Sequence, residues 1–232
     1  MHLFYDPSIE RNASIHLLSE EESKHACKVL RLVSGNQITL VNGKGIEFIA
    51  TITDAHPKRC KVEITAQLIE EKQGKEIHIA IAPTKIIDRI EWFLEKATEI
   101  GITEITPIIC SNSERKQIKE ERLEKIIISA MKQSKRLFLP KLNPLIDFAT
   151  FIKTHPKGLI AHCYEGEKNT IPEILTPTDC PILIGPEGDF TLQEVEKAIA
   201  SGYKTITLGT NRLRTETAGL YAVMQGKLFI DK

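Results

Sequence analysis

The sequence lacks the features that would place it in several large classes of protein. Its apolar runs are far shorter than the roughly 18 residues of a membrane span, and its N-terminus has no basic stretch leading into a long apolar segment, as a secretory signal has. Its five cysteines include no C-x-x-C pair, which argues against a zinc knuckle or a disulfide scaffold. We therefore expect a cytoplasmic protein with neither a membrane partner nor a metal.

Common catalytic and nucleotide-binding motifs are also missing. The sequence has no G-x-S-x-G, no G-x-x-x-x-G-K-[ST], no G-x-G-x-x-G after a strand and no H-E-x-x-H. Lys and Arg number 31, as do Asp and Glu, so the net charge does not indicate a nucleic-acid binder. The charges are segregated, however, with nine Lys/Arg against four Glu between residues 114 and 141. That segment could attract phosphate, or it could be a solvated helix face.

The patterns that are present divide the chain into two parts. Residues 1–70 contain short stretches of alternating apolar and polar residues, two of them flanking the N-G-K-G turn at residues 42–45, which predicts a small β-barrel. The charged residues 70–76 predict a linker. Residues 77–232 alternate strand and helix patterns, which predicts an α/β domain whose parallel sheet is covered on both faces.

Two loops in the second part follow predicted strands and lead into predicted helices. Residues 182–190 read I-L-I-G-P-E-G-D-F, and residues 208–219 read L-G-T-N-R-L-R-T-E-T-A-G. Ligands of open parallel sheets bind beyond the carboxyl ends of the strands, and glycines let the backbone approach a ligand closely. One loop is acidic and the other basic, which favours a zwitterionic ligand beside an anionic polymer. A tight turn in the first loop and a helix cap at Thr215 are the alternatives that need no ligand.

The order of these features resembles the RsmE family of 16S rRNA uridine-N3 methyltransferases, in the SPOUT superfamily. The two loop motifs carry the resemblance, and H-A-C-K-V-L-R at residues 25–31, E-K-A-T-E-I-G at residues 95–101 and the Gln-Ser pair before Arg136 add to it. The resemblance covers the whole chain. It implies a PUA-like RNA-binding β-barrel in residues 1–70, a SPOUT methyltransferase domain with a trefoil knot in residues 77–232, and a homodimer.

The resemblance also implies a reaction and its partners. S-adenosylmethionine would donate a methyl group to N3 of one uridine in the decoding region of 16S rRNA, within the small ribosomal subunit and without a metal. The residues implied to bind the cofactor are Cys163, Ile184, Gly185, Pro186, Glu187, Gly188, Leu208, Gly209, Leu213, Thr217 and Ala218. The residues implied to bind RNA are His25, Lys28, Arg31, Lys132, Gln133, Lys135, Arg136 and Arg212.

Arg214 and Glu216 are the predicted catalytic residues. Arg214 could stabilise negative charge on a uracil carbonyl, and Glu216 could act as a general base or orient Arg214. Stabilisation of a helix N-terminus is an equally good interpretation of Glu216. The chain departs from the family pattern at Asp189 and Lys135, where many members have glycine. These departures concern the shape of the cofactor loop and an expected RNA contact.

Two other functions fit the same features. A SPOUT methyltransferase acting on another rRNA base or on tRNA would share the fold and the cofactor loops. A non-catalytic ribosome-assembly factor would share the RNA-binding barrel, although a binding module has no need of the R-T-E-T segment at residues 214–217. Either the helix predicted over residues 119–136 or the final helix could supply the dimer contact.

Overall fold

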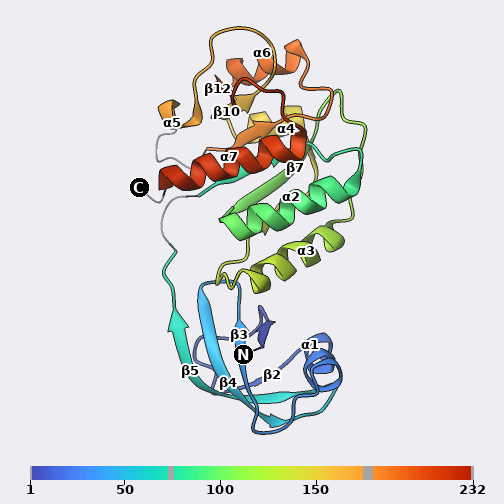
Figure 1. Cartoon of the computed structure of the whole chain (residues 1–232), viewed down its shortest axis with the longest axis vertical. Coiled ribbons are helices and arrows are strands. Elements are labelled where there is room, and N and C mark those ends of the chain that lie inside the picture. Colours follow the sequence, from blue (N-terminus) through green and yellow to red (C-terminus); the bar gives the residue numbers. More distant parts are fainter. Residues whose placement is uncertain (1, 73–75, 175–179, 231–232) are drawn as a thin grey trace. The chain divides into compact units, whose positions relative to one another are not determined.

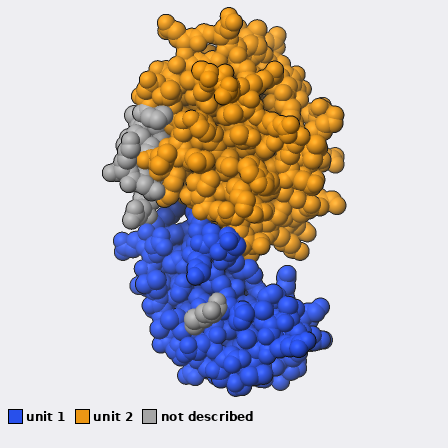
Figure 2. Space-filling model, viewed as in Figure 1, with its two compact units in different colours: residues 1–73, 131–139 blue, residues 74–130, 140–232 orange. Residues whose placement is uncertain are grey.

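The computed structural model describes residues 2–72, 76–174 and 180–230 (Figure 1). Contacts between residues divide the chain into two compact units (Figure 2). Unit 1 contains the described residues among 1–73 and 131–139, and unit 2 contains those among 74–130 and 140–232. No helix in the described part of the chain is long and apolar enough to cross a membrane.

Unit 1 is built on a curled five-stranded sheet (Figure 1). Its strands are β1 (Leu3–Tyr5), β2 (Ile15–Leu17), β3 (Gln37–Val41), β4 (Ile46–Asp54) and β5 (Lys61–Ile69), in the spatial order β1-β3-β4-β5-β2. β1 pairs with β3 in parallel and the other pairs are antiparallel. Alternate residues of β4, including Phe48 and Ile52, are buried in the core, which confirms the predicted alternation.

A short helical segment follows β2. Ser19 caps α1 (Glu20–Lys24), because its hydroxyl accepts a hydrogen bond from the amide of Glu22. The chain continues directly into a π-helical turn, η1 (His25–Val29). Glu22 is directed away from the cap, because its Oε1 accepts from the Tyr5 amide and from Lys132.

Residues 131–139 belong to unit 1, although they lie outside the first domain predicted from the sequence. The Gly45 amide donates to the Leu137 carbonyl over 3.0 Å, and the Leu139 amide donates to the Gly43 carbonyl over 2.9 Å. Met131 and Leu137 are buried against Val41. The β3–β4 hairpin therefore receives an apolar segment from much later in the chain.

Unit 2 is built on a parallel sheet. Its strands are β6 (His78–Ile81), β7 (Glu104–Ile109), β8 (Lys141–Leu142), β9 (Ile146–Asp147), β10 (Gly158–Ala161), β11 (Ile182–Ile184) and β12 (Tyr203–Ile206). Its helices are α2 (Ile87–Ile100), α3 (Glu120–Gln133, whose last residues belong to unit 1), α4 (Phe148–Thr154), α5 (Ile171–Ile174), α6 (Leu192–Ala200) and α7 (Thr215–Ile230). The strand order is β12-β10-β11-β6-β7-β8, and β9 also pairs with β7. The predicted α/β fold is confirmed, whereas the trefoil knot stays a prediction.

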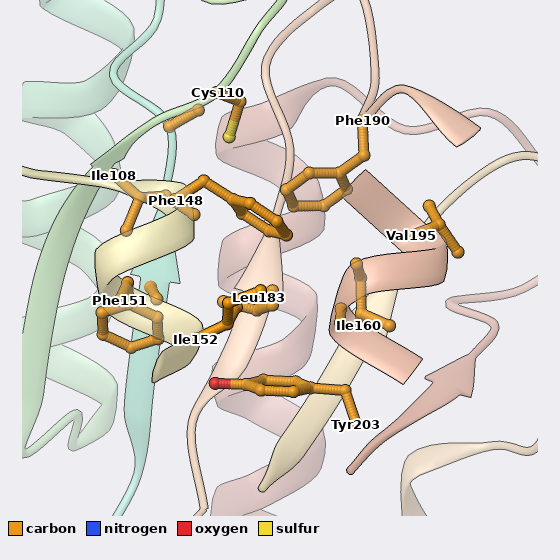
Figure 3. Packing of buried hydrophobic residues seen from close by; sticks show 13 residues of the cluster. Ile108, Cys110, Phe148, Phe151, Ile152, Ile160, Leu183, Phe190, Val195 and Tyr203 are labelled. Carbon is orange, nitrogen blue, oxygen red and sulfur yellow. The ribbon is translucent and has the colours of Figure 1, made fainter. Parts of the chain in front are cut away.

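Helices cover both faces of this sheet. On one face, Phe151 of α4 and Val195 of α6 pack with Ile160, Leu183 and other buried residues (Figure 3). On the other face, α7 packs against α2 and β6. A Cβ atom added at Gly219 would lie 2.8 Å from Ile81 Cδ1, so glycine is required for this close approach. The helices on the two faces hold the sheet in place, and with it the ends of β11 and β12, where the two loops identified in the sequence begin.

Candidate active site

The carboxyl ends of three neighbouring strands, β10, β11 and β12, open into one cavity of about 820 Å³. Ala161, Ile184 and Ile206, the last residues of these strands, line it. Both loops singled out in the sequence contribute to its wall. The volume lies within the range of small-molecule sites, and its position is the one where open parallel sheets bind ligands.

Hydrogen bonds hold the loops at this edge of the sheet. The Thr215 hydroxyl, at the start of α7, donates to the Gly185 carbonyl over 3.1 Å, which joins the two predicted loops. The Lys85 amide donates to Glu187 Oε1 over 2.9 Å. Asn112 Nδ2 donates to the carbonyls of Gly188 and Asp189. The wall is therefore held in place by residues that follow β6 and β7, as well as by the loops themselves.

Most of the residues implied to bind the cofactor line this cavity. Those that do so are Cys163, Ile184, Gly185, Pro186, Glu187, Gly188, Leu208, Gly209, Leu213 and Ala218. Thr217 is exposed and is not among the lining residues. In the first turn of α7, the side chains of Thr215 and Thr217 point in different directions. Thr215 is the one that forms a hydrogen bond with the loop after β11, at the Gly185 carbonyl.

The two predicted catalytic residues have different environments. Arg214 is exposed and lines the cavity, and no acid among the described residues lies within ion-pair distance of its guanidinium. Glu216 is buried and is not among the lining residues. Its Oε1 lies 3.8 Å from Nε of Arg89, at the start of α2, and its Oε2 has no hydrogen-bond partner among the described residues.

The charged residues that line the cavity are mixed in sign. They are Lys168, Glu187, Asp189, Arg212 and Arg214. His162 also lines it, and burial lowers the pKa of its imidazole, which keeps the ring neutral at pH 7. Burial, followed by the charge of Asp189, raises the pKa of Cys163, which disfavours the reactive thiolate form. No group of three or more metal-binding side chains occurs in the described ranges.

Comparisons with known proteins identify the family. Residues 70–225 match the family model described as "RNA methyltransferase domain", and residues 18–65 match that described as "RNA methyltransferase PUA domain". A protein of Rickettsia conorii named "Ribosomal RNA small subunit methyltransferase E" is 32% identical over 97% of this chain and 94% of its own length. The chain belongs to the RsmE family of RNA methyltransferases.

Solved structures of RsmE-like proteins have the same fold. A crystal structure described as a probable rRNA-methyltransferase from Porphyromonas gingivalis is 40% identical, covers 100% of this chain and 99% of the other, and has a TM-score of 0.89. A Ribosomal RNA small subunit methyltransferase E from Neisseria gonorrhoeae, crystallised with S-adenosyl methionine, is 29% identical, with coverage of 97% and 96% and a TM-score of 0.85.

The cavity of this RsmE-family chain fits a ligand of that kind. Apolar side chains at the strand ends, together with Leu208 and Leu213, suit a flat heterocycle. The carboxylate of Glu187 and the cations Lys168 and Arg212 suit the charged groups of an amino acid. The backbone of Gly209 has a φ of 110°, and a Cβ atom added there would have nothing within 4 Å, which leaves a ligand room beside it.

The predicted RNA-binding residues fall in two places. Arg212 lines the cavity of unit 2. The others, His25, Lys28, Arg31, Lys132, Gln133, Lys135 and Arg136, all belong to unit 1, because residues 131–139 pack against the hairpin. Lys28 and Lys135 are exposed, whereas Lys132 pairs with Glu22 at 3.0 Å. Burial lowers the pKa of Arg136.

Several residues that shape the site were not predicted from the sequence. Asn112 holds the first loop, and Arg115 donates to the carbonyls of Thr84 and Lys85. Arg89 faces Glu216. These residues are single polar side chains outside any motif, and only the parallel order of β6, β7 and β11 brings their loops together.

Proposed function

We propose that this chain transfers a methyl group from S-adenosylmethionine to N3 of a single uridine, uracil 1498, in the decoding region of 16S rRNA. The observation that carries the proposal is the guanidinium of Arg214, which has no acidic partner among the described residues and lies on the cavity wall formed by the two loop motifs. The family and the names of its members, small subunit methyltransferase E, support the substrate.

The residues of the cavity can perform this reaction by positioning and electrostatic stabilisation. When bound, S-adenosylmethionine supplies the methyl group: the electron pair on N3 forms the new bond to carbon, the electrons of the C–S bond return to sulfur, and the N3 proton leaves. Arg214 stabilises the negative charge that develops on the uracil carbonyls as this proton is lost. Glu216 is buried outside the cavity lining, so we propose that it accepts the proton through one intervening water. The acceptor would be its Oε2, which has no partner among the described residues.

Unit 1 is the proposed RNA-holding part of the chain. Lys28, Arg31 and Lys135 are exposed cations of that unit, and cations of this kind bind phosphates. We propose that they hold the RNA while the target uridine is turned out of its stack and enters the cavity. The match of residues 18–65 to a PUA domain of RNA methyltransferases supports this role.

A methyl-transfer assay tests the function directly. Purified chain and labelled S-adenosylmethionine are incubated with small ribosomal subunits from cells that lack this methyltransferase, and the product nucleoside is identified by mass spectrometry. We expect 3-methyluridine, confined to the decoding region of 16S rRNA. Subunits from cells that contain the enzyme are the control, because their site is already methylated and should accept no label.

The other outcomes separate the competing functions. A labelled base elsewhere in rRNA, or label in tRNA alone, would identify a methyltransferase with a different substrate. Cofactor binding without any methylated product on free RNA, precursor particles or subunits would favour a non-catalytic assembly factor. Either result would overturn the proposed reaction.

We also propose that the chain forms a homodimer through α7. This helix has apolar residues on all sides, and such a helix is normally buried on both faces. Ala222 and Val223 are buried within unit 2, whereas Tyr221, Met224 and Leu228 are between 39% and 67% exposed. A second copy of the chain presents the same apolar face, so a two-fold contact would cover both. The alternative, α3, begins with the charged residues Glu120 and Glu121.

Disruption of this face should produce monomers. We expect the wild-type chain to sediment as a dimer, and the Met224→Glu/Leu228→Glu variant to sediment at 26.1 kDa, because each charge would be buried against apolar surface. Leu192→Glu is the matched control, since Leu192 is 56% exposed on α6, away from α7. Sedimentation equilibrium at micromolar concentration decides the matter, and a dimeric double variant would exclude this interface.

A further inference from the structure

Asp189 has an unusual backbone conformation in the wall of the cavity. Its φ is 62°, in the left-handed region that few residues other than glycine adopt without cost, although Asp and Asn tolerate it best. Its amide donates to the Pro186 carbonyl over 2.9 Å, and its carbonyl accepts from Asn112. The turn after β11 therefore holds the Asp189 side chain in one place.

The carboxylate of Asp189 joins two loops of the cavity. Its Oδ2 accepts from the Cys163 amide, in the loop after β10, over 2.8 Å. Its Oδ1 accepts from the Phe190 amide over 2.8 Å. Phe190 is fully buried in the core (Figure 3), so the carboxylate connects the Cys163 loop to a rigid part of the unit.

The charge of Asp189 matters as well as its hydrogen bonds. Among the described residues, three cations line the cavity, Lys168, Arg212 and Arg214, against two acids, Glu187 and Asp189. The Lys168 ammonium donates to the His162 carbonyl over 2.8 Å, and the Asp189 carboxylate accepts from the next residue, Cys163, so both charges lie at the same loop. Without the charge of Asp189, one acid would face three cations across the cavity.

We propose that Asp189 is a specificity-determining residue that favours the cationic methyl donor over its neutral product. The proposal rests on the proposed function, because it concerns the same cofactor site. S-adenosylmethionine carries a positive sulfonium, and S-adenosylhomocysteine carries a neutral thioether in its place. The two molecules are otherwise alike apart from the methyl group, so the electrostatic potential of the wall is the main factor that distinguishes them. The carboxylate lowers the positive potential made by Lys168 and Arg212, so it strengthens binding of the cationic sulfonium. The neutral thioether of the product gains no such stabilisation and therefore dissociates more easily.

Binding of two ligands to two matched variants tests this role. Asp189→Asn keeps the side-chain shape and the tolerance for positive φ while removing the charge. Because an amide has one acceptor oxygen, the variant also loses one of the hydrogen bonds from the Cys163 and Phe190 amides. Glu196→Gln is the control, because Glu196 is an exposed acid of α6 outside the cavity lining, and it gives the same change in net charge. Titration calorimetry gives the Kd of S-adenosylmethionine, of S-adenosylhomocysteine, and of an analogue with a protonated amine in place of the sulfonium.

The preference for the donor, expressed as the Kd of the product divided by that of the donor, should fall about fivefold in Asp189→Asn. It should be unchanged in Glu196→Gln, and the amine analogue should follow the donor. A purely structural role would weaken all three ligands alike and leave the preference unchanged, and that result would overturn the proposal. Failure of the wild-type chain to bind any of these ligands would instead overturn the proposed function.

Discussion

Replacement of Arg214 by alanine is expected to lower kcat by about 100-fold to 1,000-fold, the usual effect of removing one group that stabilises developing negative charge. Arg214 lines the cavity and has no acidic partner among the described residues, so its charge is available to the substrate. The uracil becomes anionic only as N3 loses its proton, and the stabilisation is therefore made mainly in the transition state. The Kd of S-adenosylmethionine should change by less than about threefold.

Single-turnover methylation of saturating small subunits, together with calorimetric cofactor binding, separates these effects. Thr217→Ala is the matched control, because Thr217 is in the same segment but is exposed and outside the cavity lining. Arg214→Lys should recover only part of the rate, since an ammonium does not reproduce the planar fork of the guanidinium. Equal losses in kcat and in cofactor affinity would mean that Arg214 binds the cofactor and does not stabilise the transition state.

Glu216 differs from Arg214 in what its replacement should reveal. If Glu216 accepts the proton, Glu216→Gln should remove the acidic limb of the pH–rate profile and lower kcat. If it only holds Arg89 and the first turn of α7 through its 3.8 Å contact, the same variant should lower thermal stability and leave the shape of the profile unchanged. The profile is therefore the measurement that assigns a role to Glu216.

The two loops that line the cavity could be identified from the sequence because each is a continuous segment. A buried strand, a glycine turn and a capped helix are local signals. Thr191 and Glu194 have the T-x-x-E spacing of a capping box, and they form that box at the start of α6. Gly101 ends α2 with φ of 128°, a conformation that makes glycine a common residue at the end of a helix. The placement of both loops beside one cavity follows from the parallel sheet, in which carboxyl ends of strands share an edge.

Other features depend on contacts between distant segments and carry no local signal. The segment 131–139 reads as the end of a charged helix, yet its Leu137 is buried against the first hairpin. β8 and β9 have two residues each, too few for a periodic pattern to appear. Nothing in the sequence indicates that the carboxylate of Asp189 reaches the amide of Cys163 from 26 positions away.

Acidification should destabilise unit 2 through one buried histidine. His78, at the start of β6, is 7% exposed, and its Nε2 lies 2.8 Å from the Thr106 hydroxyl. Burial lowers the pKa of His78 from 6.5 to about 4, and Glu104, His155, Lys141 and Glu76 add smaller effects of both signs. In the unfolded chain the imidazole takes up a proton below pH 6.5, whereas in the folded chain it stays neutral until about pH 4. Stability is therefore fully present above pH 6.5 and falls as the pH is lowered toward 4, by about 3 kcal/mol in total.

Urea unfolding at several pH values between 7 and 4 measures this effect, with the fluorescence of Trp92, the one tryptophan of the chain, reporting on unit 2. His78→Gln can still bond to Thr106 but does not titrate, so its free energy of unfolding should depend less on pH by about 3 kcal/mol over this interval. His2→Gln, which removes an exposed histidine of unit 1, should keep the wild-type dependence. Parallel pH dependence in the wild type and His78→Gln would mean that His78 takes up its proton in the folded state as readily as in the unfolded state. A histidine buried without charge between β6, β7 and α4 destabilises the folded chain when it is protonated, so it would make the wild type more acid-sensitive than the variant. If the two proteins do not differ, the acid sensitivity of unit 2 lies with its other titrating groups.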